Sequence, residues 1–149
     1  MIKRLGGVRW NRLHSLVYPL ALIAIWHFFL QTKLDVSQPV LMLGFLVWLM
    51  AFRLMRRFDI AVRPLQLVAL ALISGIATVL LEALWYATMT GVMASRILMA
   101  NLDIEFGLRP ALWVLLAGLA LAAVNLVRLA TRKPGAQRGR QRAAVAAAE

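Results

Sequence analysis

Residues Arg12 to Leu34 read RLHSLVYPLALIAIWHFFLQTKL, and this stretch decides how the chain folds. It is apolar and long enough for a helix that crosses a membrane, which needs about 20 predominantly apolar residues. It also contains both histidines of the sequence, His14 and His27. An imidazole in hydrocarbon is costly unless it has a partner, so both histidines are candidate ligands for a metal or cofactor.

The composition indicates a membrane protein. Of the 149 residues, 62% are hydrophobic, whereas an ordinary soluble domain is about 45–50% apolar. The sequence has no cysteine, which excludes disulfides, thiolate ligands, iron–sulfur clusters and covalent attachment of c-type haem. The net charge is +11, but the basic residues flank apolar segments, so we expect a lipid bilayer and no nucleic acid as partner.

Four apolar segments predict an all-α fold, a multi-pass transmembrane bundle with four spans. Pro39, Pro64 and Pro110 stand near the starts of three of these segments, where the missing N–H of proline does no harm. The segment between the third and fourth spans predicts a mixed, acidic loop with Asp103 and Glu105. The predicted spans cover approximately residues 15–32, 38–54, 64–90 and 110–129, the loop covers residues 91–107, and residues 132–149 predict a disordered basic tail.

The basic residues predict the orientation. The segment before the first span carries four Lys or Arg, the loop after the second span carries four, and the sequence from Arg128 onward carries six. The first loop carries one and the third loop two. With four spans, every basic-rich segment lies on one side of the membrane, so the positive-inside rule predicts that both termini are cytoplasmic.

The spacing of the histidines limits what they can bind. Thirteen residues of helix separate His14 from His27 by about 20 Å, which is too far for one metal and fits two irons at different depths. On a straight helix the two side chains point about 140° apart, and Pro19 between them can bend the helix and change that angle. One histidine can also be a ligand while the other has a different role, such as an interfacial position for His14.

A haem iron with two histidine ligands takes one from each of two facing helices. The other three spans contain no histidine. Met42, Met50 and Met89 are alternative ligands, although methionine in apolar helices more often packs. We therefore expect the opposite ligand to come from another chain or from sequence upstream of residue 1.

Two further groups of residues invite interpretation. Glu82 lies within the third span and predicts either a hydrogen-bonded carboxyl between helices or a site for a proton or a partner arginine. Arg53, Arg56 and Arg57 are topology signals, and they are also suited to haem propionates or the phosphate of an anionic cofactor.

Residues Arg9 to Arg57 resemble the C-terminal part of the haem-binding MsrQ (YedZ) membrane subunits, which belong to the ferric-reductase-like transmembrane group. The pattern is RW, two residues, LH, one residue, LVY, a second histidine thirteen residues after the first, and a K-x-D loop before another span. The residues that fall on it are His14, Leu16, Val17, Tyr18, His27, Lys33 and Asp35.

The resemblance implies an electron-carrying subunit, not the catalytic one, in which His14 and His27 hold haem b and Arg12 and Arg53 also bind the cofactor. FMN is a candidate second cofactor. The implied partners are a periplasmic molybdopterin-containing methionine sulfoxide reductase and, as electron donor, a cytoplasmic flavin reductase or the quinone pool, with the protein in the bacterial inner membrane.

In that interpretation residues 1–57 form the C-terminal part of the haem-binding domain, residues 58–131 add two helices, and the chain is an N-terminally truncated member. The alternatives are a four-span structural or assembly protein without a cofactor, and a transporter that uses Glu82 as a proton site.

Overall fold

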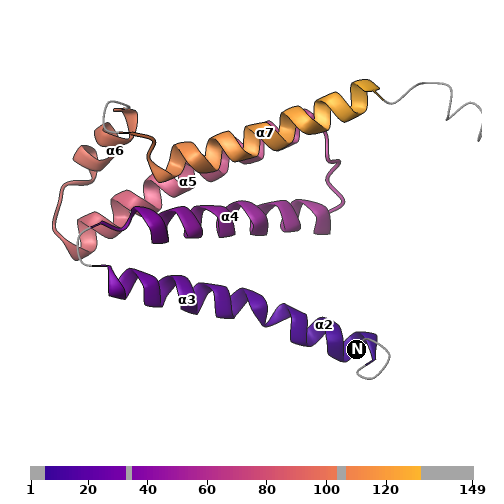
Figure 1. Ribbon diagram of the computed structural model, residues 1–149, viewed down its shortest axis with the longest axis horizontal. Helices are drawn as coiled ribbons and strands as arrows, with labels where there is room; N and C mark the ends of the chain where they lie inside the picture. Colours follow the sequence, from indigo (N-terminus) through magenta and orange to yellow (C-terminus); the bar gives the residue numbers. More distant parts are fainter. Residues whose placement is uncertain (1–5, 33–34, 104–106, 132–149) are drawn as a thin grey trace, which may run out of the picture.

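The computed structural model describes residues 6–32, 35–103 and 107–131. These residues form helices and connecting turns, without a strand. The helices, shown in Figure 1, are α2 (Gly7–Ser15), α3 (Val17–Gln31), α4 (Ser37–Arg57), α5 (Pro64–Met89), α6 (Ala94–Leu102) and α7 (Pro110–Thr131).

The structure confirms the predicted all-α fold with four candidate membrane spans. The helical segments long and apolar enough to cross a bilayer are Arg9–Gln31, Ser37–Arg57, Pro64–Met89 and Pro110–Thr131. The last three start within one residue of the predicted positions. The basic tail predicted over residues 132–149 and Glu105 lie outside the described residues.

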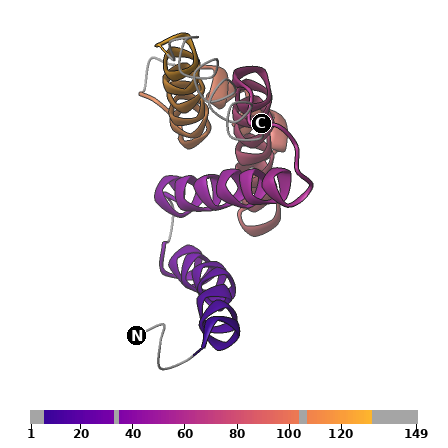
Figure 2. The ribbon, with the colours of Figure 1, turned by 90° about the vertical axis from the view of Figure 1, so that its right-hand side faces the viewer.

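Helices α4, α5 and α7 form a three-helix unit, and α3 lies beside it along α4 (Figures 1 and 2). The contact of α3 with the unit is made by Ile25 and Phe29, which are buried against Val36 and Val40. Trp85 of α5 extends this contact, because its ring centre lies 4.4 Å from that of Phe29. Nearer the start of α3, Tyr18 makes a second contact, with Arg53 of α4.

Two glycines let the three helices approach closely. A Cβ on Gly44 of α4 would lie 2.5 Å from Thr78 Oγ1 and 2.8 Å from Val114 Cγ2. A Cβ on Gly118 of α7 would lie 2.6 Å from the Cβ of Ala71 on α5. Small residues at these positions maximise van der Waals contact where no hydrophobic effect drives helices together.

The first span is interrupted at Leu16, between α2 and α3. Pro19 has no N–H to donate to the carbonyl of Ser15, four residues earlier, so the helical ladder loses a bond here. Leu16 N–H instead donates to the Leu13 carbonyl, three residues back, at 3.2 Å. A bend attributable to Pro19 was predicted, and the structure places the interruption at Leu16.

The segment predicted as a mixed loop over residues 91–107 contains a helix, α6. Ile97 and Asn101 are buried and lie one turn apart on its inner face, whereas Met99 and Leu102 are exposed. The apolar and polar residues of this segment therefore have helical periodicity, which its charges and short length obscured.

Most of the described basic residues lie at one end of the fold. In Figure 1, α2 lies at the same end of the molecule as the end of α4, the start of α5 and the end of α7, whereas α6 and the start of α7 lie at the opposite end. By their positions along these helices, Arg12, Arg53, Arg57, Arg63 and Arg128 belong to the first end, and Arg96 and Arg109 belong to the second. This arrangement is the one that four membrane spans and the positive-inside rule require.

We predict that Gly118→Ala lowers the free energy of unfolding by about 1–3 kcal/mol, because the new methyl group overpacks the α5–α7 contact. Gly75→Ala is the matched control, since its Cβ would meet Leu115 Cβ at an ordinary 3.4 Å. Thermal unfolding in detergent measures both variants. Equal stability of Gly118→Ala and the unmodified protein would contradict the close packing.

Candidate functional site

His27 lies in the middle of an exposed apolar stripe on α3. At about 100° per residue, Leu20, Ile23 and Leu30 point within about 60° of His27. Their exposed fractions are 61%, 64% and 63%, and His27 is itself exposed. Because the buried Ile25 and Phe29 occupy the opposite side of the helix, the imidazole points away from α4, α5 and α7.

The ring of His27 meets a polar group on its own helix. Its Nε2 lies 3.3 Å from Nε2 of Gln31, one turn later. The amide can fix the ring orientation by donating a hydrogen bond to this nitrogen. A ligand that binds through Nε2 must displace this amide, whereas Nδ1 faces no such competition from Gln31.

His14 lies in α2, on the other side of the interruption at Leu16, and is also exposed. Its ring stacks on Trp10, with centroids 6.3 Å apart and planes 12° from parallel. Arg12, two residues earlier, is exposed as well. His14 and His27 are therefore apart in the structure. Their spacing in the sequence predicted this separation. In the described residues no group of three His, Cys, Asp or Glu side chains is placed to hold a metal.

Arg53 joins α4 to α3 through Tyr18. Its Nη1 donates a hydrogen bond to the Tyr18 hydroxyl, and its guanidinium carbon lies 4.7 Å from the centre of the tyrosine ring. Both residues are near the basic end of the molecule, Tyr18 on the face of α3 that meets α4 and Arg53 on α4. Arg53, a candidate partner of an anionic cofactor by sequence, thus also has a contact with Tyr18 that the sequence does not predict.

Glu82 is completely buried in α5, and its carboxylate binds one side chain from α6 and one from the residue before α7. Arg109, just before α7, donates from Nη1 to Oε1 at 2.8 Å. Asn101 of α6 donates from Nδ2 to Oε2 at 2.8 Å. The predicted partner arginine is therefore present. Asn101 was missed, although its position four residues after Ile97 matches the inner face of α6.

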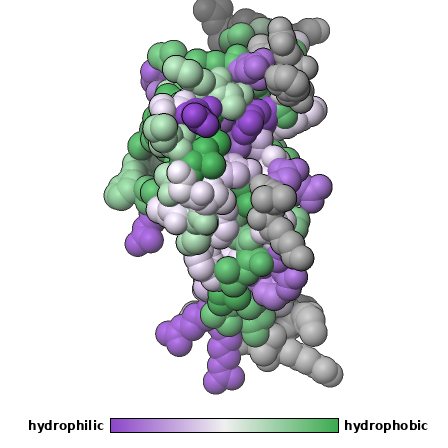
Figure 3. All heavy atoms as spheres, turned by 90° about the vertical axis from the view of Figure 1, so that its left-hand side faces the viewer, coloured by the Kyte–Doolittle hydropathy of each residue, from purple (hydrophilic) through white to green (hydrophobic). Residues whose placement is uncertain are grey.

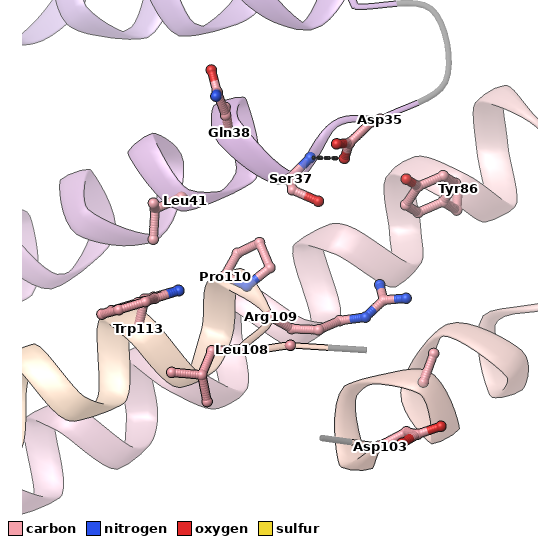
Figure 4. Close-up of a pocket in the computed structure, with 12 residues that line it drawn as sticks. Asp35, Ser37, Gln38, Leu41, Tyr86, Asp103, Leu108, Arg109, Pro110 and Trp113 are labelled. Carbon is pink, nitrogen blue, oxygen red and sulfur yellow. Dashed lines mark hydrogen bonds between the residues drawn. The ribbon is translucent and has the colours of Figure 1, made fainter. Parts of the chain in front are cut away.

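A cavity of about 640 Å³, which we call the polar cavity, opens beside this ion pair at the end of the bundle where α4 and α7 begin (Figure 4). Figure 4 shows Arg109 extending between Asp35 and Asp103, with Tyr86 nearby. In Figure 3 hydrophilic and apolar patches alternate over this end of the molecule. The lining residues are Asp35, Ser37, Gln38, Leu41, Tyr86, Ala100, Asp103, Gly107, Leu108, Arg109, Pro110 and Trp113.

Asp35 stays charged in this cavity. Hydrogen bonds from the side chain and the backbone of Ser37 lower the pKa of its carboxyl, and the positive charge of Arg109 lowers it further. The backbone N–H of Ser37 donates to Asp35 Oδ1 at 2.9 Å. This contact places a carboxylate at the start of α4, where the helix dipole favours negative charge.

Comparisons with known proteins agree with the pattern around the histidines. An MsrQ haem-binding subunit of a protein-methionine-sulfoxide reductase from Rhodospirillum rubrum is 48% identical over 54 residues, 36% of this chain and 26% of the relative. The subunit of the same name from Xanthomonas campestris is 42% identical over 50 residues, 34% of this chain and 23% of the relative. The one from Agrobacterium fabrum is 42% identical over 55 residues, 37% and 25% of the two chains.

The chain is similar to MsrQ haem-binding subunits. This confirms the resemblance predicted from RW, LH, LVY and the second histidine. The match spans about a third of this chain and about a quarter of the length of the curated relatives. No family model matches the sequence, and no solved structure matches it. The four apolar helices and this similarity together indicate a multi-pass membrane protein.

We predict that Arg109→Ala destabilises the protein by about 3 kcal/mol, because it leaves the buried Glu82 carboxylate without its counter-charge. Glu82→Gln should cost less, since Asn101 can still donate to the amide oxygen and a third of the Arg109 side chain is exposed. Arg96→Ala, an exposed arginine at the same end, is the control. Thermal unfolding in detergent ranks the three variants, and an equal effect of Arg96→Ala would contradict the ion pair.

We also predict that Ser37→Ala raises the pKa of Asp35, because it removes the side-chain hydrogen bond that lowers it most. The stability that Asp35 contributes is complete above its ordinary pKa and is lost as pH falls through the lowered value. Chemical-shift titration of the Asp35 carboxyl carbon measures the change. An unchanged midpoint in Ser37→Ala would show that Ser37 does not set this pKa.

Proposed function

We propose that this protein is a haem-binding membrane subunit that carries electrons to a methionine sulfoxide reductase. The observation that supports this most directly is the position of His27, a histidine within a membrane span that points outward from the centre of an exposed apolar stripe. The similarity to MsrQ haem-binding subunits supports it from the sequence.

The stripe on α3 fits a haem. The macrocycle is flat and apolar, and Leu20, Ile23 and Leu30 would cover one of its faces while His27 supplies an axial ligand. Gln31, which contacts Nε2 of His27, would have to move aside for a haem held through that nitrogen. A bound haem supplies one-electron redox chemistry, and the protein contributes the ligand, the apolar surroundings and the depth in the membrane.

A haem held by two histidines would need a second ligand besides His27. Helices α4, α5 and α7 lie on the opposite side of α3 and carry no histidine. We therefore propose that the opposite ligand belongs to a helix packed on the outer stripe of α3, from another chain or from sequence beyond these 149 residues. His14, at a different depth, is the proposed ligand of a second haem.

Arg12 and Arg53 are the proposed partners of the haem propionates. Arg12 is exposed beside His14, and Arg53 lies at the same end of the bundle. The guanidinium of Arg53 has several donors, so it can bind an anion while its Nη1 remains bonded to Tyr18. FMN is a proposed second cofactor, because the positive charges of these two arginines could also bind its phosphate.

The direction of electron flow follows from the proposed orientation. With both termini cytoplasmic, His14 is near the donor side and His27 nearer the outer side. We propose haem b as the carrier and a cytoplasmic flavin reductase or the quinone pool as donor. The acceptor would be a periplasmic molybdopterin-containing reductase, with this protein in the inner membrane and residues 1–57 as its haem-binding part.

Glu82 needs no role in transport to explain its burial. Its pairing with Arg109 and Asn101 compensates the carboxylate, which is the arrangement expected of a structural link between helices. The alternative of a cofactor-free structural protein keeps this link but gives His27 no purpose at the lipid-facing surface.

We predict that the full-length gene product purified from haem-supplied membranes has the absorption spectrum of bis-histidine haem b, and that His27→Ala loses the haem that His27 binds. His14→Ala should lose about half of the haem per chain if a second haem is present. Leu22→Ala is the control, because Leu22 is exposed on α3 but points about 140° away from His27. Absorbance and a pyridine haemochrome assay give the stoichiometry. A colourless unmodified protein, or a full haem content in His27→Ala, would contradict the proposal.

A further inference from the structure

Two methionines at the short helix α6 lie on the surface of the molecule, at the end where α7 begins (Figure 1). Met93, directly before the helix, is 64% exposed, and Met99, within it, is 72% exposed. Met55, near the end of α4, is only 8% exposed and belongs to a buried apolar cluster. The three methionines therefore differ strongly in how easily a dissolved reagent can reach their sulfur atoms.

The packing of α6 turns Met99 outward. Ile97 and Asn101 are buried, and they stand two positions before and two positions after Met99. At about 100° per residue, each of them points about 160° away from Met99. Asn101 is held in place because its Nδ2 donates to Glu82 Oε2 at 2.8 Å. The contact that holds α6 on α5 therefore keeps the thioether of Met99 on the opposite side of the helix.

The exposed side of α6 is polar. Ser95 and Arg96 stand four and three positions before Met99, so they point within about 60° of it, and both are exposed. A charged guanidinium is costly in hydrocarbon, so this side of α6 lies in water or among lipid headgroups. Met93 lies in the connection between α5 and α6, beside the same polar residues. Both thioethers are therefore accessible to small polar reagents.

An accessible thioether is oxidised to methionine sulfoxide. Hydrogen peroxide transfers one oxygen atom to the sulfur, which loses two electrons, and the rest of the peroxide leaves as water. The reverse conversion adds two electrons and two protons to the sulfoxide and releases its oxygen as water. A buried thioether such as that of Met55 is protected, because the peroxide cannot reach its sulfur.

We propose that Met93 and Met99 are oxidation sites, and that their sulfoxides are substrates of the reductase to which this protein delivers electrons. The repair step rests on the proposed function. With both termini cytoplasmic, α6 lies on the outer side of the membrane, where the proposed reductase works. Because Met99 points away from the contact of α6 with α5, its sulfoxide stays on the surface and can be reduced without unfolding the helix. The electron carrier is then repaired by the enzyme that it supplies.

Peptide mass spectrometry of the full chain in lipid nanodiscs, after a short treatment with hydrogen peroxide, tests the oxidation sites. We expect Met93 and Met99 to gain oxygen at least about tenfold faster than Met55, because oxidation follows exposure of the sulfur. Ile97→Met is the matched control, since it places a thioether on the buried face of the same helix, and this thioether should be oxidised as slowly as Met55. Equal rates at Met99 and at the thioether of Ile97→Met, or slower oxidation of Met93 and Met99 than of Met55, would overturn the proposal.

The repair step is tested on the oxidised protein with the purified periplasmic reductase, which receives electrons either from a chemically reduced viologen or through the haem of this protein. With the viologen, we expect the sulfoxides of Met93 and Met99 to return to thioethers. Sulfoxides that persist at both positions, while the same reductase reduces free methionine sulfoxide, would overturn the proposal. Reduction with the viologen but not through the haem would contradict the proposed function and support Met93 and Met99 as substrates.

Discussion

Polar groups within a bilayer must find partners, because no water is present to solvate them. This constraint accounts for the helices, which satisfy their backbone groups internally. It also accounts for the two hydrogen-bond partners of the buried Glu82. Its carboxylate accepts hydrogen bonds of 2.8 Å from Arg109 and Asn101. These bonds join α5, α6 and the start of α7. The buried carboxylate thereby holds α6 and the start of α7 against α5.

His27 meets the same constraint differently. Its ring contacts the amide of Gln31 on its own helix, but it points away from the three-helix unit toward a surface of exposed leucine and isoleucine side chains. The packing of α4, α5 and α7 through Gly44 and Gly118 is complete without α3's outer face. The scaffold and the proposed cofactor surface are therefore separate, and the stripe on α3 is available to a haem and a facing helix.

Much of this could be predicted from the sequence. Hydropathy predicts the four spans, because the length of an apolar run depends only on consecutive residues. The prolines mark the starts of three helices. The two-histidine pattern gave the similarity to MsrQ subunits. Contacts between distant residues could not be obtained in this way. Asn101 of α6 binding Glu82, and Tyr18 holding Arg53, depend on how helices are placed side by side, which periodicity does not report. The helix α6 was missed because nine residues of mixed polarity carry a weak periodic signal.

If His27 is a haem ligand, pulsed electron paramagnetic resonance on protein labelled with ¹⁵N-histidine detects its contact with the iron directly. The chain has two histidines, so His14→Ala leaves His27 as its single labelled imidazole. In membranes that contain the oxidised protein, we predict hyperfine coupling of ¹⁵N to a low-spin ferric haem in His14→Ala, and loss of one imidazole coupling when His27 is also replaced. Identical coupling with and without His27, or no coupling at all, would contradict the account.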